Sequence, residues 1–142
     1  MKRTATAVWS GSLREGKGTL TSPSGVLEDT PYTFVSRFES GKETNPEELV
    51  AAAHSGCFAM ALSGVLTEAG FKAERLAATA EVSLENVPPK GWTVTKSHLV
   101  LNAKIPNIDD AKFQELAGKA KANCPISRLL TAEVSLQATL EK

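Results

Sequence analysis

The chain of 142 residues is long enough for one domain, residues 1–142, with its own hydrophobic core. Its 16 basic and 16 acidic residues cancel, and no lysine- or arginine-rich stretch could follow a phosphate backbone, so we expect no nucleic-acid partner. Two cysteines are too few for a disulfide scaffold and the N-terminus lacks an apolar signal core, which together predict a cytoplasmic protein whose cysteines are catalytic, metal-binding or inert.

Three short strands are predicted in the first part of the chain. Residues 4–9 and 18–22 are separated by turn residues and can pair with each other. Pro31 then opens a third predicted strand, Tyr32 to Phe38. Because side chains alternate along a strand, Arg37 faces away from the aromatic residues of this segment. Arg37 is therefore predicted to be a cation at the end of a strand.

The segment from Asn45 to Gly70 is predicted to form one long helix. Asn45 can cap its first turn, Pro46 suits the first helical position, and Gly70 suits the left-handed turn that ends a helix. No charged side chain lies between Leu49 and Leu66. A helix that is apolar on all sides should be buried on all sides.

The apolar run is about as long as the shortest helix that spans a bilayer. However, it is rich in Ala, Gly and Ser, contains a histidine and lies in the middle of the chain. These features favour a core helix that packs closely against a sheet or against a second copy of itself. We therefore expect no membrane association.

The second half of the chain is predicted to contain a hairpin, a second helix and a closing strand. Residues 78–85 and 92–105 alternate apolar and polar side chains on either side of a Pro-Pro-Lys-Gly turn, which predicts the hairpin. A helix capped by Asp109 or Asp110 follows, and residues 132–140 alternate again. The residues expected on the inner face of the second helix are Ala111, Phe113, Leu116, Ala117 and Ala120.

The order of these elements predicts the fold class. Strands joined by hairpins rather than by repeated crossovers indicate an α+β fold with mainly antiparallel sheets and a long buried central helix. A thin sheet cannot cover a helix that is apolar on all sides. We therefore expect an intertwined homodimer in which a second copy covers the remaining face.

Cys57 lies halfway along the predicted central helix. Its position fits an inert buried thiol as well as a reactive one. A reactive thiol needs a nearby cation and access to solvent, and Arg37 is the best candidate for the cation. At about 100° per residue, Glu47 lies about 80° round the helix from Cys57, whereas Glu48 lies nearly opposite. Glu47 is therefore favoured as the carboxylate that orients the arginine.

Cys124 lies between the second predicted helix and Pro125, where it can cap a further helical turn. The dipole of that turn is expected to lower the pKa of the thiol. If Cys124 can reach Cys57, the two form a peroxidatic and resolving pair, because a sulfenic acid condenses readily with a neighbouring thiol. The alternative by residue type is a zinc site made of these cysteines with His54 and His98, although the chain has no tight pair of ligands.

Three segments resemble the osmotically inducible protein C and organic hydroperoxide resistance family, in the family's order along nearly the whole chain. They are P-Y-T-F-V-S-R-F-E at residues 31–39, T-N-P-E-E-L-V-A-A-A-H-S-G-C-F-A-M-A-L at residues 44–62, and A-N-C-P-I-S at residues 122–127. G-K-G-T at residues 16–19 also fits. His54 and the two adjacent glutamates resemble the osmotically inducible branch more than the other branch.

The resemblance implies an intertwined homodimer with two active sites at the subunit interface, and a thiol peroxidase that uses no haem, metal or flavin. It assigns four residues by position. Cys57 is the implied peroxidatic thiol and Cys124 the implied resolving thiol. Arg37 is the residue implied to stabilise thiolate and peroxide, and Glu47 is its implied carboxylate partner.

The implied reaction reduces organic hydroperoxides, and hydrogen peroxide more weakly. It passes through a sulfenic acid on Cys57 and a disulfide with Cys124, which an external dithiol such as a lipoylated protein reduces. The candidates for binding an alkyl tail are Phe34, Phe38, Phe58 and Met60. The alternative function is that of a thiol redox sensor or binding protein, in which the same cysteines change conformation without turnover.

Overall fold

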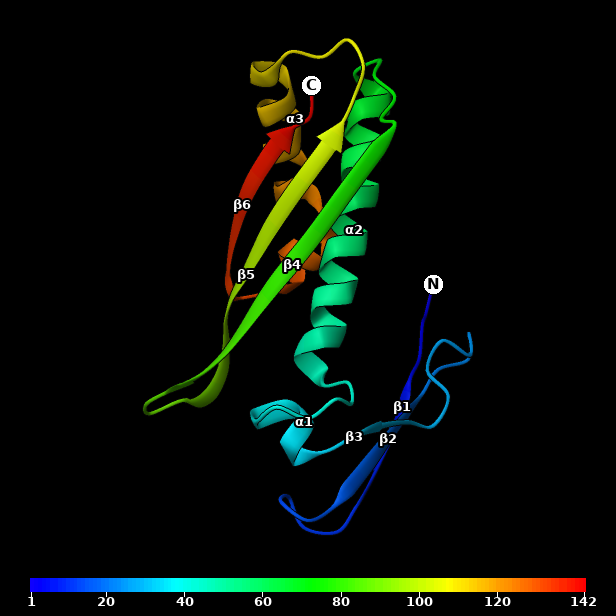
Figure 1. The fold of residues 1–142 in the computed structure, drawn as a ribbon, viewed down its shortest axis with the longest axis vertical. Helices are drawn as coiled ribbons and strands as arrows, with labels where there is room; N and C mark the ends of the chain where they lie inside the picture. Colours follow the sequence, from blue (N-terminus) through cyan, green and yellow to red (C-terminus); the bar gives the residue numbers. More distant parts are fainter. The chain divides into compact units, whose positions relative to one another are not determined.

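The computed structural model describes residues 1–142 and divides them into two compact units, residues 1–49 and 50–142 (Figure 1). The long helix α2, Pro46–Glu68, begins in the first unit and continues through the second. Each unit has a three-stranded sheet of its own. The expectation of one domain over residues 1–142 stays a prediction.

The first unit contains a small antiparallel sheet in the order β1-β2-β3, with β1 at Thr6–Ser10, β2 at Lys17–Thr21 and β3 at Thr30–Tyr32. The predicted pairing of the first two strands is confirmed. Gly18 lies opposite both Trp9 and Tyr32, whose ring centroids are 5.4 Å apart. A Cβ atom at position 18 would lie 2.4 Å from the Tyr32 ring, so only glycine leaves room for the two rings.

The prediction of a strand over residues 32–38 is wrong, because the strand ends at Tyr32 and a short helix, α1, follows at Phe34–Phe38. Thr33 starts this helix with a capping box. Its hydroxyl accepts a hydrogen bond from the backbone N–H of Ser36 at 3.1 Å, and the Ser36 hydroxyl accepts one from the N–H of Thr33 at 2.9 Å. Arg37 therefore lies in the last turn of a helix.

The second unit contains the long hairpin that the sequence predicts, with β4 at Arg75–Val87 and β5 at Gly91–Lys104. The closing strand β6, Glu133–Leu140, pairs with β5 in parallel. The chain reaches β6 through the helices α3, Asp110–Asn123, and α4, Pro125–Leu129. A helical crossover returns the chain to the same end of the sheet, so this sheet is mixed rather than antiparallel throughout.

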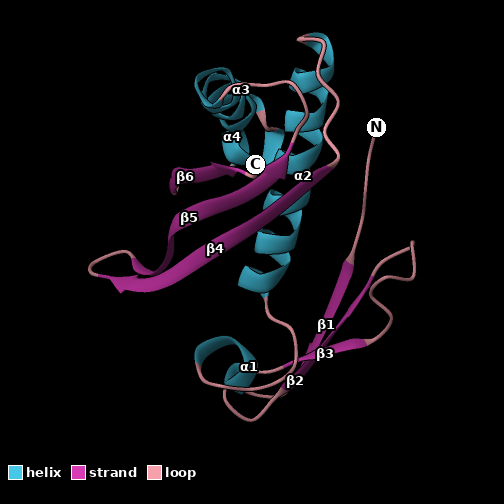
Figure 2. Ribbon diagram, turned by 45° about the horizontal axis from the view of Figure 1, so that its top comes forward, coloured by secondary structure: helices cyan, strands magenta, loops and turns pink.

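The core of the second unit lies between its sheet and its two long helices. Leu99 and Leu101 of β5, Phe58 and Leu62 of α2, and Phe113 of α3 are all fully buried. The helices α2 and α3 therefore cover the same face of the sheet (Figure 2). Of the inner face predicted for α3, all members but Ala111 are buried.

Both ends of α2 agree with the sequence prediction. The Asn45 side chain accepts a hydrogen bond from the N–H of Glu48 at 2.8 Å. At the other end, Gly70 has a φ of 87°, and the N–H of Phe71 donates to the carbonyl of Leu66 at 2.8 Å. These contacts satisfy backbone groups that a helix end would otherwise leave unpaired.

A single chain buries α2 on one side only, and the burial of its other side by a second copy stays a prediction. Only 22% of its most apolar 18-residue window is buried, and the Met60 side chain is 79% exposed. The helix is long and apolar enough to cross a membrane by length and composition alone. One sheet and α3 can cover only one side of such a helix, so its opposite side faces outward.

Candidate functional site

The two thiols of the second unit are neighbours and both are free. Cys57 lies in the middle of α2, half-buried against the core, with its S–H donating to the sulfur of Cys124. Cys124 lies between α3 and α4 and is fully buried. The architecture therefore brings together two cysteines that are far apart in the sequence.

Burial raises the pKa of the Cys57 thiol, and the hydrogen bond that it donates to Cys124 raises this pKa further. The N–H of Ile126 acts in the opposite direction without reversing the shift. Residues 50–142 hold no cation beside Cys57 that would favour its thiolate. These groups of the second unit therefore disfavour the thiolate of Cys57.

Cys124 has the position of the N-cap of α4, as the sequence predicts, but makes no regular capping hydrogen bond. Burial alone would raise the pKa of Cys124. Weaker interactions of its sulfur with the N–H of Ser127, the Cys57 thiol and the Ser127 hydroxyl outweigh burial and lower this pKa. These local groups therefore lower the pKa of Cys124, whereas burial and the contact with Cys124 raise the pKa of Cys57.

Arg37 and Glu47 form an ion pair in the first unit. The Arg37 Nη2 lies 2.9 Å from Glu47 Oε1, and its Nε lies 3.3 Å from each carboxylate oxygen. The neighbouring Glu48 has a different partner, since it accepts a hydrogen bond from the Thr44 hydroxyl at 2.8 Å. Arg37 is thus paired with Glu47, the glutamate that helical geometry favours over Glu48.

Hydrogen bonds between α1 and the start of α2 position this ion pair. The buried Ser36 donates its hydroxyl to the carbonyl of Thr44 at 2.9 Å, and the side chain of Asn45 donates to the carbonyl of Ser36 at 3.0 Å. Arg37 and Glu47 lie close in sequence to these anchored positions. The local backbone therefore sets the direction in which the guanidinium points.

A pocket of about 230 Å³ lies beside Arg37 within the first unit. The aromatic rings of Trp9, Tyr32, Phe34 and Phe38 line it, and the ring centroids of Phe34 and Phe38 are 4.8 Å apart. The guanidinium carbon of Arg37 lies 5.2 Å from the centroid of the Phe38 ring. The pocket can hold an apolar group next to a cation.

Of the four apolar residues expected to line a pocket, Phe34 and Phe38 lie in the wall of this one. Phe58 and Met60 do not. Phe58 is fully buried in the core of the second unit, and Met60 is exposed on α2. Spacing along a helix cannot distinguish core positions from pocket positions, so the sequence could not separate these roles.

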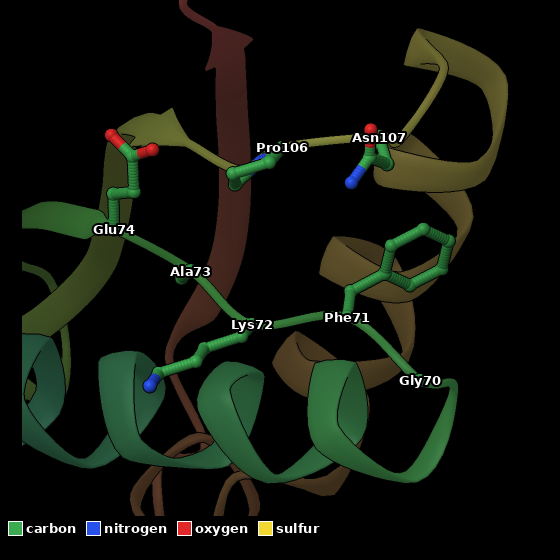
Figure 3. A pocket seen from close by; sticks show the side chains of 7 residues that line it. All are labelled: Gly70, Phe71, Lys72, Ala73, Glu74, Pro106 and Asn107. Carbon is green, nitrogen blue, oxygen red and sulfur yellow. The ribbon is translucent and has the colours of Figure 1, made fainter.

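A larger hollow of about 700 Å³ lies beyond the end of α2, where residues 70–74 meet Pro106 and Asn107 (Figure 3). Its charged side chains, Lys72 and Glu74, point in different directions. It contains neither of the two thiols. The hollow therefore offers no sulfur that a peroxide could oxidise.

His54 is fully buried one turn before Cys57, and both of its ring nitrogens have serine partners. Nδ1 lies 2.7 Å from the Ser97 hydroxyl and Nε2 lies 2.7 Å from the Ser127 hydroxyl. Burial lowers the pKa of His54. Sequence reasoning missed both serines, because they are 43 and 73 residues away and no short motif links them to the histidine.

The geometry does not support the zinc alternative. Both ring nitrogens of His54 are hydrogen-bonded to hydroxyl groups. The Nδ1 atom of His98 lies 2.6 Å from the Ser135 hydroxyl oxygen. No three His, Cys, Asp or Glu side chains gather as a set of metal ligands. The two histidines therefore contribute to hydrogen-bonded pairs within the protein.

Known proteins share both the sequence and the fold of this chain. Residues 39–139 match the model of the OsmC-like protein family. The chain is 47% identical over 135 residues to "Peroxiredoxin OsmC" of Escherichia coli (strain K12), covering 95% of this chain and 94% of that one. It is 32% identical over 124 residues to "Organic hydroperoxide resistance protein OhrB" of Bacillus subtilis (strain 168), covering 87% and 89%.

The crystal structure of that Bacillus subtilis OhrB superimposes with a TM-score of 0.71 at 29% sequence identity, covering 97% of this chain and 98% of the other. The α+β architecture with its long central helix is therefore shared as well as the sequence. Both kinds of similarity extend over almost the whole chain. The protein belongs to the OsmC/Ohr family.

Proposed function

We propose that this protein is a thiol peroxidase that reduces organic hydroperoxides to alcohols, and hydrogen peroxide more weakly. The observation that carries the proposal is the pair of adjacent reduced thiols, one half-exposed and one fully buried. Its context is a chain that is 47% identical to a peroxiredoxin. Cys57 has the accessibility of a peroxidatic thiol, and Cys124 has the position of a resolving thiol.

The reaction begins with attack of the Cys57 thiolate on the terminal oxygen of the hydroperoxide. The O–O bond breaks, the alkoxide leaves and is protonated to the alcohol, and Cys57 becomes a sulfenic acid. Cys124 then attacks the sulfur of Cys57, so that a disulfide forms and water is released. An external dithiol, such as a lipoyl group on a protein, restores both thiols by exchange.

Arg37 supplies the positive charge that Cys57 requires in this proposal. Burial and the contact with Cys124 raise the pKa of Cys57, and a guanidinium is the side chain that remains charged at every physiological pH. Glu47 orients that guanidinium through the observed ion pair. The aromatic pocket beside Arg37 then receives the alkyl group of the substrate, which favours organic hydroperoxides.

The working form that we propose is an intertwined homodimer in the cytoplasm. The exposed apolar side of α2 supports it, since a second copy of the chain can cover this surface. Two identical sites, each with Cys57, Cys124, Arg37 and Glu47, then form in one dimer. Size-exclusion chromatography with light scattering tests the assembly, and a monomer at micromolar concentration would contradict it.

Peroxidase activity is tested by stopped-flow measurements with purified protein, dihydrolipoamide and cumene hydroperoxide. Wild type should turn over, and Cys57→Ser should not. Cys124→Ser should retain the first oxidation and lose the disulfide. Turnover by Cys57→Ser at the wild-type rate would overturn the mechanism. Slow stoichiometric oxidation of wild type without turnover would favour the redox-sensor alternative.

A further inference from the structure

A buried histidine that the peroxidase reaction does not use is connected to the resolving thiol through one hydroxyl group. His54 and Ser97 are both fully buried, and Ser127 is half-buried. Ser97 lies on β5, His54 on α2 and Ser127 on α4. Three separate elements thus converge on this imidazole, and its contacts leave no ring nitrogen unsatisfied.

Ser127 connects the imidazole to the sulfur of Cys124. Its hydroxyl lies 2.7 Å from His54 Nε2 and also interacts with the sulfur of Cys124, which lowers the pKa of that thiol. Its backbone N–H interacts with the same sulfur. Cys124 in turn accepts a hydrogen bond from the Cys57 thiol. The contacts therefore form an unbroken series from Ser97 through His54 and Ser127 to the two cysteines.

A serine hydroxyl can donate one proton and accept others, so this series can exist in two protonation states. In the first, neutral His54 donates from Nδ1 to Ser97 and accepts at Nε2 from Ser127, whose oxygen accepts from the Cys124 thiol. In the second, the imidazole carries the additional proton and Ser127 donates to the Cys124 thiolate. The two states differ only by the shift of one proton from Cys124 to Ser127 and of another from Ser127 to His54.

We propose that His54 is a positioning residue for the resolving step: acting through the Ser127 hydroxyl, it holds the Cys124 sulfur toward Cys57 and takes up the proton that Cys124 loses. This inference rests on the proposed peroxidase function, because it concerns the second chemical step of that function. Burial lowers the pKa of His54, which keeps the imidazole neutral and able to accept a proton before the step begins.

Atoms and charges balance in the step. The Cys124 sulfur attacks the Cys57 sulfur, the S–S bond forms, and the S–O bond of the sulfenic acid breaks. The Cys124 sulfur donates the electron pair that forms the S–S bond, so Cys124 is oxidised and the sulfenic sulfur of Cys57 is reduced. Its proton passes to Ser127 while the Ser127 proton passes to His54. The hydroxide that leaves and the imidazolium then give one water and neutral His54.

The test separates the two chemical steps in single turnovers. Reduced protein is mixed with stoichiometric cumene hydroperoxide, quenched with acid at successive times, alkylated and analysed by intact-mass spectrometry. For His54→Gln we expect disulfide formation to slow on the order of 10- to 100-fold, with oxidation of Cys57 unchanged within about twofold. Excess hydroperoxide should also give more sulfinic acid on Cys57, because its sulfenic acid persists longer.

Two further variants and a matched control accompany His54→Gln. Ser127→Ala should slow disulfide formation similarly, and Ser127→Thr should restore the rate because it returns a hydroxyl. The double variant His54→Gln/Ser127→Ala should form the disulfide no more slowly than the slower of the two single variants. His98→Gln is the control. His98 makes the same kind of contact with Ser135, but it follows Ser97 in β5 and points to the opposite face of the sheet.

Disulfide formation at the wild-type rate in folded His54→Gln would overturn the proposal. Equal slowing of both steps would also overturn it, since that is the effect of lost packing alone. If His54→Gln does not fold, Ser127→Ala provides the test instead. An unchanged rate of disulfide formation in Ser127→Ala would refute the role of His54 in the resolving step. Failure of wild-type Cys57 to consume hydroperoxide would instead refute the peroxidase function itself, so the two failures are distinguishable.

Discussion

Replacing Glu47 by glutamine keeps the size of the side chain and removes the charge that orients Arg37. A hydrogen bond between charged groups contributes about 1.5–3 kcal/mol when it is shielded from water. In this ion pair Glu47 is 12% exposed and Arg37 is 38% exposed, so the low end of that range applies. A loss of about 1.5 kcal/mol of transition-state stabilisation corresponds to slightly more than a tenfold slower oxidation of Cys57. The free energy of unfolding should fall by less than about 1 kcal/mol, because a partly exposed ion pair stabilises little.

The assay is the second-order rate constant for oxidation of Cys57 by cumene hydroperoxide, measured under pseudo-first-order conditions. Glu48→Gln is the matched control, because Glu48 lies in the same first turn of α2 but bonds to Thr44 rather than to Arg37. In an Arg37→Ala background, Glu47→Gln should have no further effect. Equal slowing by Glu47→Gln and Glu48→Gln, or an additive effect in that background, would refute the role of the ion pair.

Three other substitutions test the fold and the histidine. Phe58→Ala should lower the free energy of unfolding, measured with guanidinium chloride, by about 3–5 kcal/mol, since the ring is fully buried among core residues. Gly18→Ala should lower it by about 1–3 kcal/mol, because the new methyl group would lie 2.4 Å from Tyr32. The lowered pKa of His54 predicts that wild type loses stability as the pH falls below 6.5, where the unfolded imidazole binds a proton and the folded one does not. His54→Gln should show less of this loss, and an identical pH profile would contradict the assignment.

Local signals in the sequence were sufficient where a few adjacent residues determine the structure. Asn45 and Gly70 are found at the two ends of α2, as their capping preferences predict. The hairpin of β4 and β5 follows from alternation on both sides of a turn. In these places local conformation and tertiary structure agree, so reasoning from neighbouring residues succeeds.

Prediction from the sequence failed where local patterns are compatible with more than one structure. A five-residue helix such as α1 is too short to show helical periodicity, and the capping box at Thr33 and Ser36 was the one signal for it. Alternation alone also cannot tell whether a strand is parallel or antiparallel, so it did not give the direction of β6. The partners of His54 and the exposed side of α2 depend on tertiary contacts that leave no local pattern.

The electrostatics of the two cysteines explain why residues far apart in the chain are needed for one reaction. Local groups favour the thiolate of Cys124 over that of Cys57, which is the wrong order for attack on a hydroperoxide. In the proposed reaction, the guanidinium of Arg37 reverses that order for the first step. Once Cys57 carries a sulfenic acid it no longer ionises as a thiol, and the backbone N–H and hydroxyl of Ser127 then favour the thiolate that resolves it. The environment of Cys124 therefore suits the second step, and in the proposed reaction the first step depends on the charge of Arg37.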